Sequence, residues 1–213
     1  MKKAMEIKDA RDALDAEWTK LEQLPAWDLK AVRSKAKVRA EAKARGKHVH
    51  FGELMDLCTL KHAELPAHLQ RYKGRIVFRG DNVRDENNAF AVFQELSASP
   101  ASIHSANSAM AYGIIPGHKI TQADAIRAYV QSYLKTKVET WVSIPKELWP
   151  DEWYDSNGVP LYDRPMCRLI KALYGHPESG GHWENHLKEA LYALGGELIE
   201  GHQSSFHFKE SNL

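Results

Sequence analysis

Three short segments, taken in their order along this 213-residue chain, constrain its fold more than any other feature of the sequence. They read Arg71-Tyr-Lys-Gly-Arg-Ile-Val-Phe-Arg-Gly80, Gln122-Ala-Asp-Ala-Ile-Arg-Ala-Tyr129 and Cys167-Arg-Leu-Ile-Lys-Ala-Leu-Tyr-Gly175. The first is typical of a short strand, because its apolar and basic residues end in the turn-forming triplet that starts at Gly80. In the second, a strand pattern over residues 118–123 changes to helical spacing after Asp124. We therefore expect strands and helices to alternate.

Local patterns predict further elements on both sides of these segments. Apolar residues at helical spacing predict helices that start at Ile7 and Trp183 and stop near Pro25 and at Gly195. Residues 139–144 alternate as a strand does, and the tail 204–209 is expected to add one more strand. Residues 89–115 are expected to contain a helix that Pro100 begins or interrupts, with Phe90, Phe93 and Leu96 at helical spacing.

Together, the three segments resemble the fingers and the first palm motif of the copia-type retrotransposon reverse transcriptases. The family patterns read roughly R-Y-K-A-R-L-V-A-R-G, Q-x-D-V-K-T-A-F/Y and C-K-L-K-K-S-L-Y-G. The resemblance covers residues 5–213 except 30–70, and Glu139–Pro145 is similar to the family's E-x-Y/W-x-x-x-P strand. It implies an α+β fold, namely an incomplete right-hand polymerase with fingers, a partial palm and no thumb. Residues 1–70 would form an N-terminal helical region, and residues 71–213 the fingers and partial palm.

The resemblance implies that Asp124 is the first catalytic carboxylate and a metal ligand. Nucleotidyl transfer uses two divalent cations, Mg²⁺ or Mn²⁺, which are held by carboxylate oxygens. We expect Asp124 at the junction between a strand and a helix, where the helix N-terminus favours a triphosphate. The alternative is that Asp124 only caps the helix.

Tyr129 corresponds to the family's aromatic residue that packs under the incoming sugar and excludes a 2′ hydroxyl group. It follows Asp124 by about one and a half helical turns. The simpler interpretation is a core aromatic residue, and the two roles are compatible because such a residue must be held rigidly.

Basic residues of the first segment are expected to contact phosphate. Lys73, Arg75 and Arg79 alternate with other residues along one strand, so their side chains are expected on one face. Arginine binds phosphate through two parallel hydrogen bonds, which favours Arg75 and Arg79 for a triphosphate clamp. The alternative is an edge strand whose charges protect against aggregation.

The loop after the third segment resembles the family's L-Y-G-L-K-Q-S-P-R-x-W, in which a glutamine approaches the nucleotide. Here Glu178 stands at that position, so a carboxylate replaces a neutral amide, and Gly180 and Gly181 replace proline and arginine. Glu178 is the corresponding candidate for substrate binding. The alternative is a loop that only leads into the following helix.

Residues 30–47 carry eight basic side chains and one acidic side chain in an alanine-rich context, which predicts an exposed basic helix. Such a helix is a candidate for electrostatic contact with a nucleic-acid backbone, and equally for a solvated surface helix. The candidate contact residues are Lys35, Lys37, Arg39, Lys43 and Arg45.

The family's second metal-binding motif, Tyr-x-Asp-Asp, does not occur in these residues. One carboxylate does not fix two metals, so we expect no substantial DNA synthesis by this polypeptide alone. Implied partners are an RNA or DNA primer–template, deoxynucleotides and the remaining Pol segments that would supply the other carboxylates. The first alternative function is a non-catalytic nucleic-acid-binding remnant.

A second alternative is a histidine-based metalloprotein. His182 and His186 are four residues apart on a predicted helix, with His176 or His202 as a possible third ligand.

The composition fits an intracellular protein, cytoplasmic or nuclear and not secreted. Cys58 and Cys167 are the only cysteines, too few for a disulfide framework, and no stretch has the length of a membrane span. The net charge of +1 is close to neutral, so a nucleic-acid partner would depend on local clusters of Lys and Arg.

Overall fold

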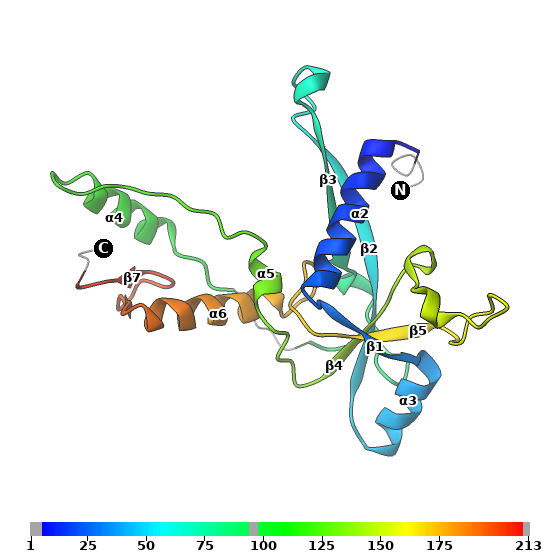
Figure 1. Cartoon of the computed structure of the whole chain (residues 1–213). Helices are drawn as coiled ribbons and strands as arrows, with labels where there is room; N and C mark the ends of the chain where they lie inside the picture. Colours follow the sequence, from blue (N-terminus) through cyan, green and yellow to red (C-terminus); the bar gives the residue numbers. More distant parts are fainter. Residues whose placement is uncertain (1–5, 94–97, 211–213) are drawn as a thin grey trace.

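A five-stranded mixed sheet forms the body of the protein (Figure 1). The structure is a computed structural model and describes residues 6–93 and 98–210. In the sheet the strands follow the order β1-β5-β4-β2-β3, and the chain therefore has an α+β fold. The strand bounds are Trp27–Ser34 for β1, Val49–Lys61 for β2, Arg71–Phe78 for β3, Glu139–Ser143 for β4 and Pro165–Leu169 for β5.

Strand β2 connects two parts of this sheet. Its first residues pair in parallel with β4, with Val49 opposite Glu139, and its second half pairs antiparallel with β3, from Leu54 opposite Phe78 to Lys61 opposite Arg71. The β2–β3 hairpin extends beyond the other strands (Figure 1). The sheet therefore joins residues from both sides of position 70, and residues 1–70 are not wholly helical.

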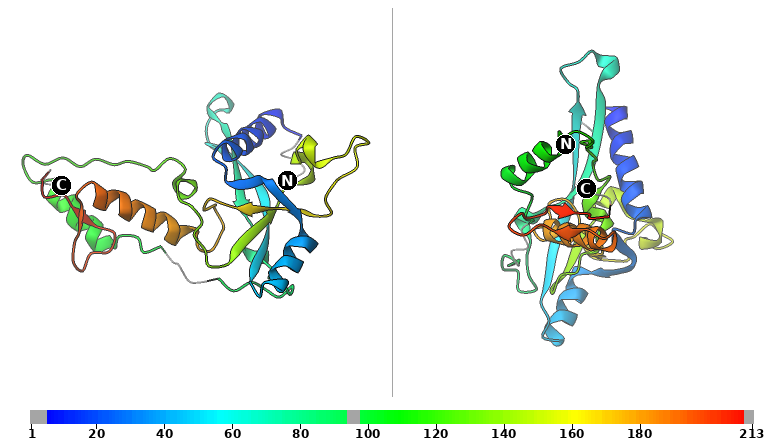
Figure 2. Two further views of the ribbon diagram at one scale, coloured as in Figure 1. Left: turned by 60° about the horizontal axis from the view of Figure 1, so that its bottom comes forward. Right: turned by 90° about the vertical axis from the view of Figure 1, so that its left-hand side faces the viewer.

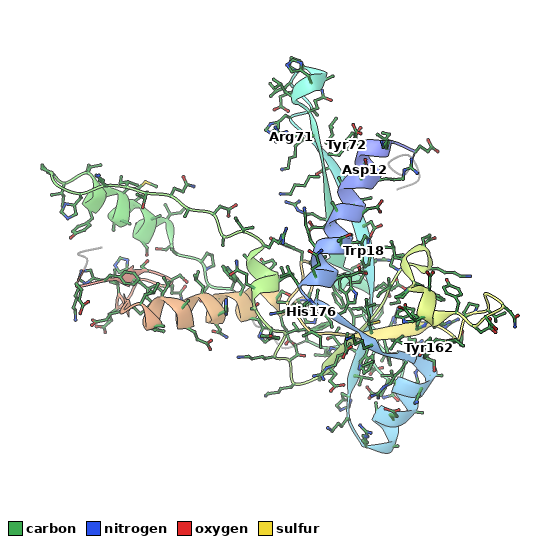
Figure 3. The ribbon with its side chains drawn as sticks, viewed as in Figure 1. Asp12, Trp18, Arg71, Tyr72, Tyr162 and His176 are labelled. Carbon is green, nitrogen blue, oxygen red and sulfur yellow. The ribbon has the colours of Figure 1, made fainter. Side chains whose placement is uncertain are left out.

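Helix α2, Lys8–Gln23, packs along the β2–β3 hairpin as its apolar spacing predicts. Its buried side chains are Ala10, Leu14, Trp18 and Leu21. Gly74 allows this close approach, because a Cβ atom there would lie 2.4 Å from the carbonyl oxygen of Ala13. The indole Nε1 of Trp18 donates a 3.1 Å hydrogen bond to Oδ1 of Asp56 on β2 (Figure 3). The predicted N-terminal helix is confirmed.

The basic helix is shorter than residues 30–47. Helix α3 comprises Lys35–Ala44, and its N-cap Ser34 accepts a hydrogen bond from the amide of Lys37. Residues 30–34 belong instead to β1, which pairs with β5 at Trp27–Asp28 and at Arg33–Ser34, on either side of an irregular stretch. The prediction of a helix from residue 30 is therefore wrong for its first five residues.

A helical arm projects from the sheet body (Figures 1 and 2). It contains α4 (Ile103–Gly113), α6 (Ser179–Ala193) and the two-stranded pair β6–β7 (Glu197–Leu198 and Phe206–His207), and short α5 (Ala128–Gln131) lies at its base.

Hydrogen bonds within the arm join the segment that contains α4 to the segment that contains α6 and β7. Glu184 accepts a 2.6 Å hydrogen bond from the amide of Ser99, and His202 Nδ1 lies 3.0 Å from Oγ of Ser105. Helix α6 ends before Gly195 as predicted, and β7 is shorter than the predicted strand. Residues 89–93 are not helical, and Leu96 lies outside the described residues.

The core lies where α2 meets the sheet. It contains Trp18, Trp27, Ile76, Phe78 and Leu173, all of which are buried. Four single-turn 3₁₀ helices complete the body: η1 Ala67–Leu69, η2 Gly80–Asn82, η3 Lys146–Leu148 and η4 Asp151–Trp153. Across residues 6–93 and 98–210, no helix has both the length and the apolar character that crossing a bilayer requires.

Candidate nucleic-acid interface

The three segments that carry the family resemblance meet at Tyr174. The amide of Phe78, at the end of β3, donates a 2.7 Å hydrogen bond to the carbonyl oxygen of Tyr174. The ring of Tyr174 contacts the ring of Tyr129 edge to face, with 4.6 Å between centroids. The three segments, which span about a hundred positions from Arg71 to Gly175, therefore contact one another in the fold.

Two glycines make this meeting of backbones possible. A Cβ atom at Gly80 would lie 2.4 Å from the carbonyl oxygen of Gly175, and a Cβ atom at Gly175 would lie 2.1 Å from the carbonyl oxygen of Phe78. Gly175 also has a φ of +87°, which side chains disfavour. The final glycines of the first and third segments are therefore both required by the same backbone contact.

A buried histidine lies under this contact. His176 is at the junction between the arm and the sheet (Figure 3), and only 4% of its surface is exposed. The amide of Glu178 donates a 3.2 Å hydrogen bond to Nδ1 of His176, so the proton of the neutral ring is on Nε2. From there it is donated to Oγ1 of Thr140, also over 3.2 Å. The rings of Phe78 and Phe93 contact the imidazole at centroid distances of 4.9 and 5.2 Å.

This environment keeps His176 neutral. Burial, followed by repulsion from His50 and His182, lowers the pKa of His176 to about 3. The sequence indicated His176 only as a possible metal ligand, and its structural role was missed. The only local signal was its position directly after the Tyr174–Gly175 pair.

The loop that carries Glu178 is closed by a serine. Oγ of Ser179 accepts a 2.9 Å hydrogen bond from the amide of Leu173 and donates a 2.7 Å bond to the carbonyl oxygen of the same residue. The side chain of Glu178 is 6% exposed and lies 3.8 Å from Nε2 of His182. Its carboxylate is therefore covered by protein in this structure, and its contact with a nucleotide stays a prediction.

The basic residues of β3 divide into two groups. Lys73 and Arg75 are exposed, whereas Gly74, Ile76 and Phe78 between and beyond them are buried, so the predicted alternation is confirmed for the first two. Lys73 and Arg75 form no ion pair with the described residues. They present uncompensated positive charge on one face of the hairpin.

Arg79 follows the end of β3 and is already paired. Its Nη1 lies 3.2 Å from Oε2 of Glu53, and its Nη2 lies 3.2 Å from Oδ2 of Asp81. Hydrogen bonding and charge attraction to Asp81, followed by Glu53, raise the pKa of Arg79. A phosphate bound by this side chain would have to compete with two carboxylates.

Asp124 does not lie at a junction between a strand and a helix. Residues 118–125 form neither, and Asp124 is exposed within them. This segment has no neighbouring strand to pair with, because the chain there runs along the arm between α4 and α5, away from the sheet (Figure 1). The predicted strand over residues 118–123 is therefore wrong, and helix α5 starts later, at Ala128.

No metal site is assembled around Asp124 or the histidines. In the part of the chain that the structure describes, no three His, Cys, Asp or Glu side chains are grouped so that they would hold a metal ion. His186 contacts the ring of Trp183, and His202 lies beside Ser105. The donors present thus do not fit a resident Mg²⁺ or zinc ion.

The predicted basic contacts of residues 35–45 lie on α3 and, for Arg45, at its C-cap. Lys37, Lys43 and Arg45 are exposed, whereas Lys35 and Arg39 are half-buried and lie over the ring of Phe51, with 5.1 and 5.9 Å to its centroid. Burial, together with the positive charges of Arg39 and Arg164, lowers the pKa of Lys35. The N-terminal half of α3 is therefore part of a larger positive cluster.

Two cavities flank this helix. The first, of about 540 Å³, lies between α3 and the starts of β2 and β4. Its cations include Arg33 and Arg168, which pair with Glu41 and Glu139. The second, of about 640 Å³, lies on the side of Lys35 and Phe51.

A comparison of the chain with protein-family models, with curated proteins and with solved structures finds no match. The resemblance to reverse transcriptases therefore depends on the residues quoted above.

Proposed function

We propose that this chain forms the fingers and an incomplete palm of a copia-type RNA-directed DNA polymerase. We further propose that these 213 residues by themselves bind nucleic acid and do not extend a primer. The observation that carries the proposal is the convergence of the three segments at Tyr174 and Gly175. A copying site needs a phosphate-binding strand and a sugar-packing aromatic residue to lie near each other, and this contact joins the segments that would supply them.

Tyr129 has the support that a sugar-selecting residue needs. Its ring is half-buried and is held edge to face by Tyr174, whose carbonyl oxygen is in turn hydrogen-bonded to β3. A rigid aromatic side chain excludes a 2′ hydroxyl group better than a mobile one, because it cannot move aside.

Phosphate contacts are assigned to Lys73 and Arg75, with Arg79 in a lesser role. The first two are exposed and without carboxylate partners among the described residues, whereas Arg79 is paired with Glu53 and Asp81. Asp124 matches the family's metal-binding position, but no other donors are grouped around it in the described residues, so two-metal chemistry would need further carboxylates from other Pol segments.

Primer–template binding and primer extension test this proposal together. We expect a labelled primer–template to bind with an affinity that falls steeply with salt, because phosphate contacts release counterions. We expect no extension with deoxynucleotides and Mg²⁺ or Mn²⁺. Absence of binding at low salt would overturn the proposal, and extension that Asp124→Asn abolishes would overturn the predicted inactivity.

A second candidate function is a nucleic-acid-binding protein without polymerase chemistry. It is favoured by the surroundings of Asp124, which is exposed in an irregular segment. Among the described residues, no other metal-binding side chains are grouped with it. The open reading frame downstream discriminates between the two. A Tyr-x-Asp-Asp motif within a few dozen residues supports the polymerase, and a stop codon supports the remnant.

A further inference from the structure

The second cavity beside α3 is a groove with an unusual concentration of positive charge. We define the α3 groove by its lining side chains Lys35, Phe51, Arg84, Lys146, Trp149 and Arg164. They come from five separate places in the chain: the start of α3, strand β2, the loop after η2, the region of η3 and the residue before β5. The fold, and not one basic run, therefore creates this site.

The four cations of the α3 groove have no carboxylate partners. No ion pair within the described residues involves Lys35, Arg84, Lys146 or Arg164. The one acidic lining residue, Glu53, is already paired with Arg79. Four positive side chains thus share a concave surface with a single carboxylate, and this excess of positive charge attracts a polyanion, because low-dielectric walls strengthen its field.

Aromatic rings contact three of these cations, and Trp149, which lines the groove, is only partly buried. Arg84 lies 3.6 Å from the centroid of the Phe90 ring, and Lys146 lies 6.0 Å from the centroid of the Trp149 ring. The indole of Trp149 is fixed by a 2.9 Å hydrogen bond from its Nε1 to the carbonyl oxygen of Ile144. A fixed indole among cations is the arrangement with which proteins bind unpaired bases beside their phosphates.

We infer that the α3 groove binds single-stranded nucleic acid, with phosphates at Lys35, Arg84 and Arg164 and a base on Trp149. The inference rests on the proposed function, and it adds a binding site that is separate from the β3 face of Lys73 and Arg75. A cavity of about 640 Å³ admits a few nucleotides of one strand. A duplex would leave the indole unused, because its bases are stacked inside it, so a single strand is the expected ligand.

Binding of an oligothymidylate of about 12 nucleotides, followed by fluorescence anisotropy, tests this inference. We expect Lys35→Gln with Arg164→Gln to weaken binding about 10- to 30-fold near 0.1 M salt and to reduce the salt slope by about 1.4, since two phosphate contacts are lost. The matched control is Lys8→Gln with Arg11→Gln, which removes one Lys and one Arg, and so the same charge, from exposed positions of α2 outside the groove. The control should change affinity much less.

A stacking variant gives an independent readout. Trp149→Leu should weaken binding about fivefold or more, and Trp149→Phe should retain most of the affinity, because a phenyl ring still stacks. Circular dichroism of all variants establishes that they are folded.

Four outcomes would overturn the inference. The first is equal losses in the groove and control variants, which would indicate general electrostatic attraction. The second is tighter binding of a duplex than of the single strand. The third is complete displacement by an equimolar deoxynucleoside triphosphate. The fourth is binding that Lys73→Gln with Arg75→Gln abolishes and the groove variants leave unchanged, in which case the proposed function would survive. Absence of all nucleic-acid binding would overturn both.

Discussion

Gly175 contacts the carbonyl oxygen of Phe78 so closely that no side chain fits between them. A Cβ atom would lie 2.1 Å from that oxygen, and the φ of +87° is itself unfavourable for other residues. The contact closes the space between β3 and the loop before α6. It is therefore the position at which a small substitution should have the largest structural effect.

Gly175→Ala should lower the free energy of unfolding by about 2–4 kcal/mol, because backbone strain is added to a clash with backbone atoms. Gly158→Ala is the matched control. Gly158 also has a positive φ, +76°, but nothing lies within 4 Å of a Cβ atom there, so about 1 kcal/mol is expected. Urea denaturation of both variants measures the difference. Equal losses in the two variants would show that the contact with Phe78 does not add to the cost of the substitution.

His176 predicts a dependence of stability on pH. Its pKa is lowered to about 3 in the folded protein, whereas an unfolded histidine titrates near 6.5. Below about pH 6.5 the unfolded chain takes up the proton and the folded chain does not, so stability is lost as the pH falls toward 3, by up to about 1.4 kcal/mol per pH unit. Stability from this group is constant above pH 7.

The comparison of the wild-type protein with His176→Gln isolates this effect. Glutamine retains a donor and an acceptor for Thr140 and Glu178, and it does not titrate. His50 and His182, whose pKa values are also lowered by burial, are present in both proteins. Urea denaturation at several pH values between 4 and 7 should give a flatter profile for the variant. Identical profiles would contradict the assignment of a neutral, buried His176.

The hydrogen bond from Trp18 to Asp56 should contribute to the attachment of α2 to the hairpin. Trp18→Phe removes the donor and leaves a half-buried carboxylate without it, for an expected loss of about 1–3 kcal/mol, part of which is lost packing. A double-mutant cycle with Asp56→Ala separates the two contributions. We expect a coupling energy of about 1 kcal/mol, and additive losses would show that the hydrogen bond is not stabilising.

The exposed cations of β3 should contribute to primer–template binding. Lys73→Gln with Arg75→Gln should reduce the affinity. It should also make the plot of log affinity against log salt less steep, by the amount that corresponds to the loss of about one to two phosphate contacts. Lys8→Gln with Arg11→Gln removes the same charge from exposed positions of α2 and serves as the control. Anisotropy titrations at two salt concentrations compare them. If the control pair has the larger effect, the phosphate role of β3 is wrong.

Elements with a strong period and clear turn signals were predictable from the sequence. Helix α2 has buried residues at every helical turn, helix α6 ends at Ala193, shortly before Gly195, and β3 ends at Phe78, shortly before Gly80. In each case local preferences and tertiary packing favour the same structure, which is why the patterns sufficed.

Strands β1 and β2 were not predictable in the same way. Residues 30–34 have the composition of a basic helix, and they belong instead to a strand that β5 holds at Trp27–Asp28 and at Arg33–Ser34. Strand β2 is stabilised by β4 on one side and β3 on the other, so its partners lie far away in the sequence. Strand propensity depends on such neighbours more than helix propensity does.

The candidate site shows the same division. The exposed alternation of Lys73 and Arg75 followed from strand geometry. The burial of His176 depends on Phe78, Phe93 and Thr140, which no local pattern brings together. The strand expected before Asp124 did not form, because a sequence with strand preference needs a neighbouring edge to pair with. The α3 groove has no local sequence signature, since its four cations come from four separate places in the chain.

The partnership of β1 with β5 has a consequence for biosynthesis. Strand β1 can pair with β5 only after Leu169, the partner of Trp27, has left the ribosome. Until then, β1 has no partner strand, and its unpaired backbone groups are open to other molecules. Chaperones act on nascent chains in this state. Folding of the sheet during translation is therefore expected to be late, because the sheet closes only after Leu169 has been made.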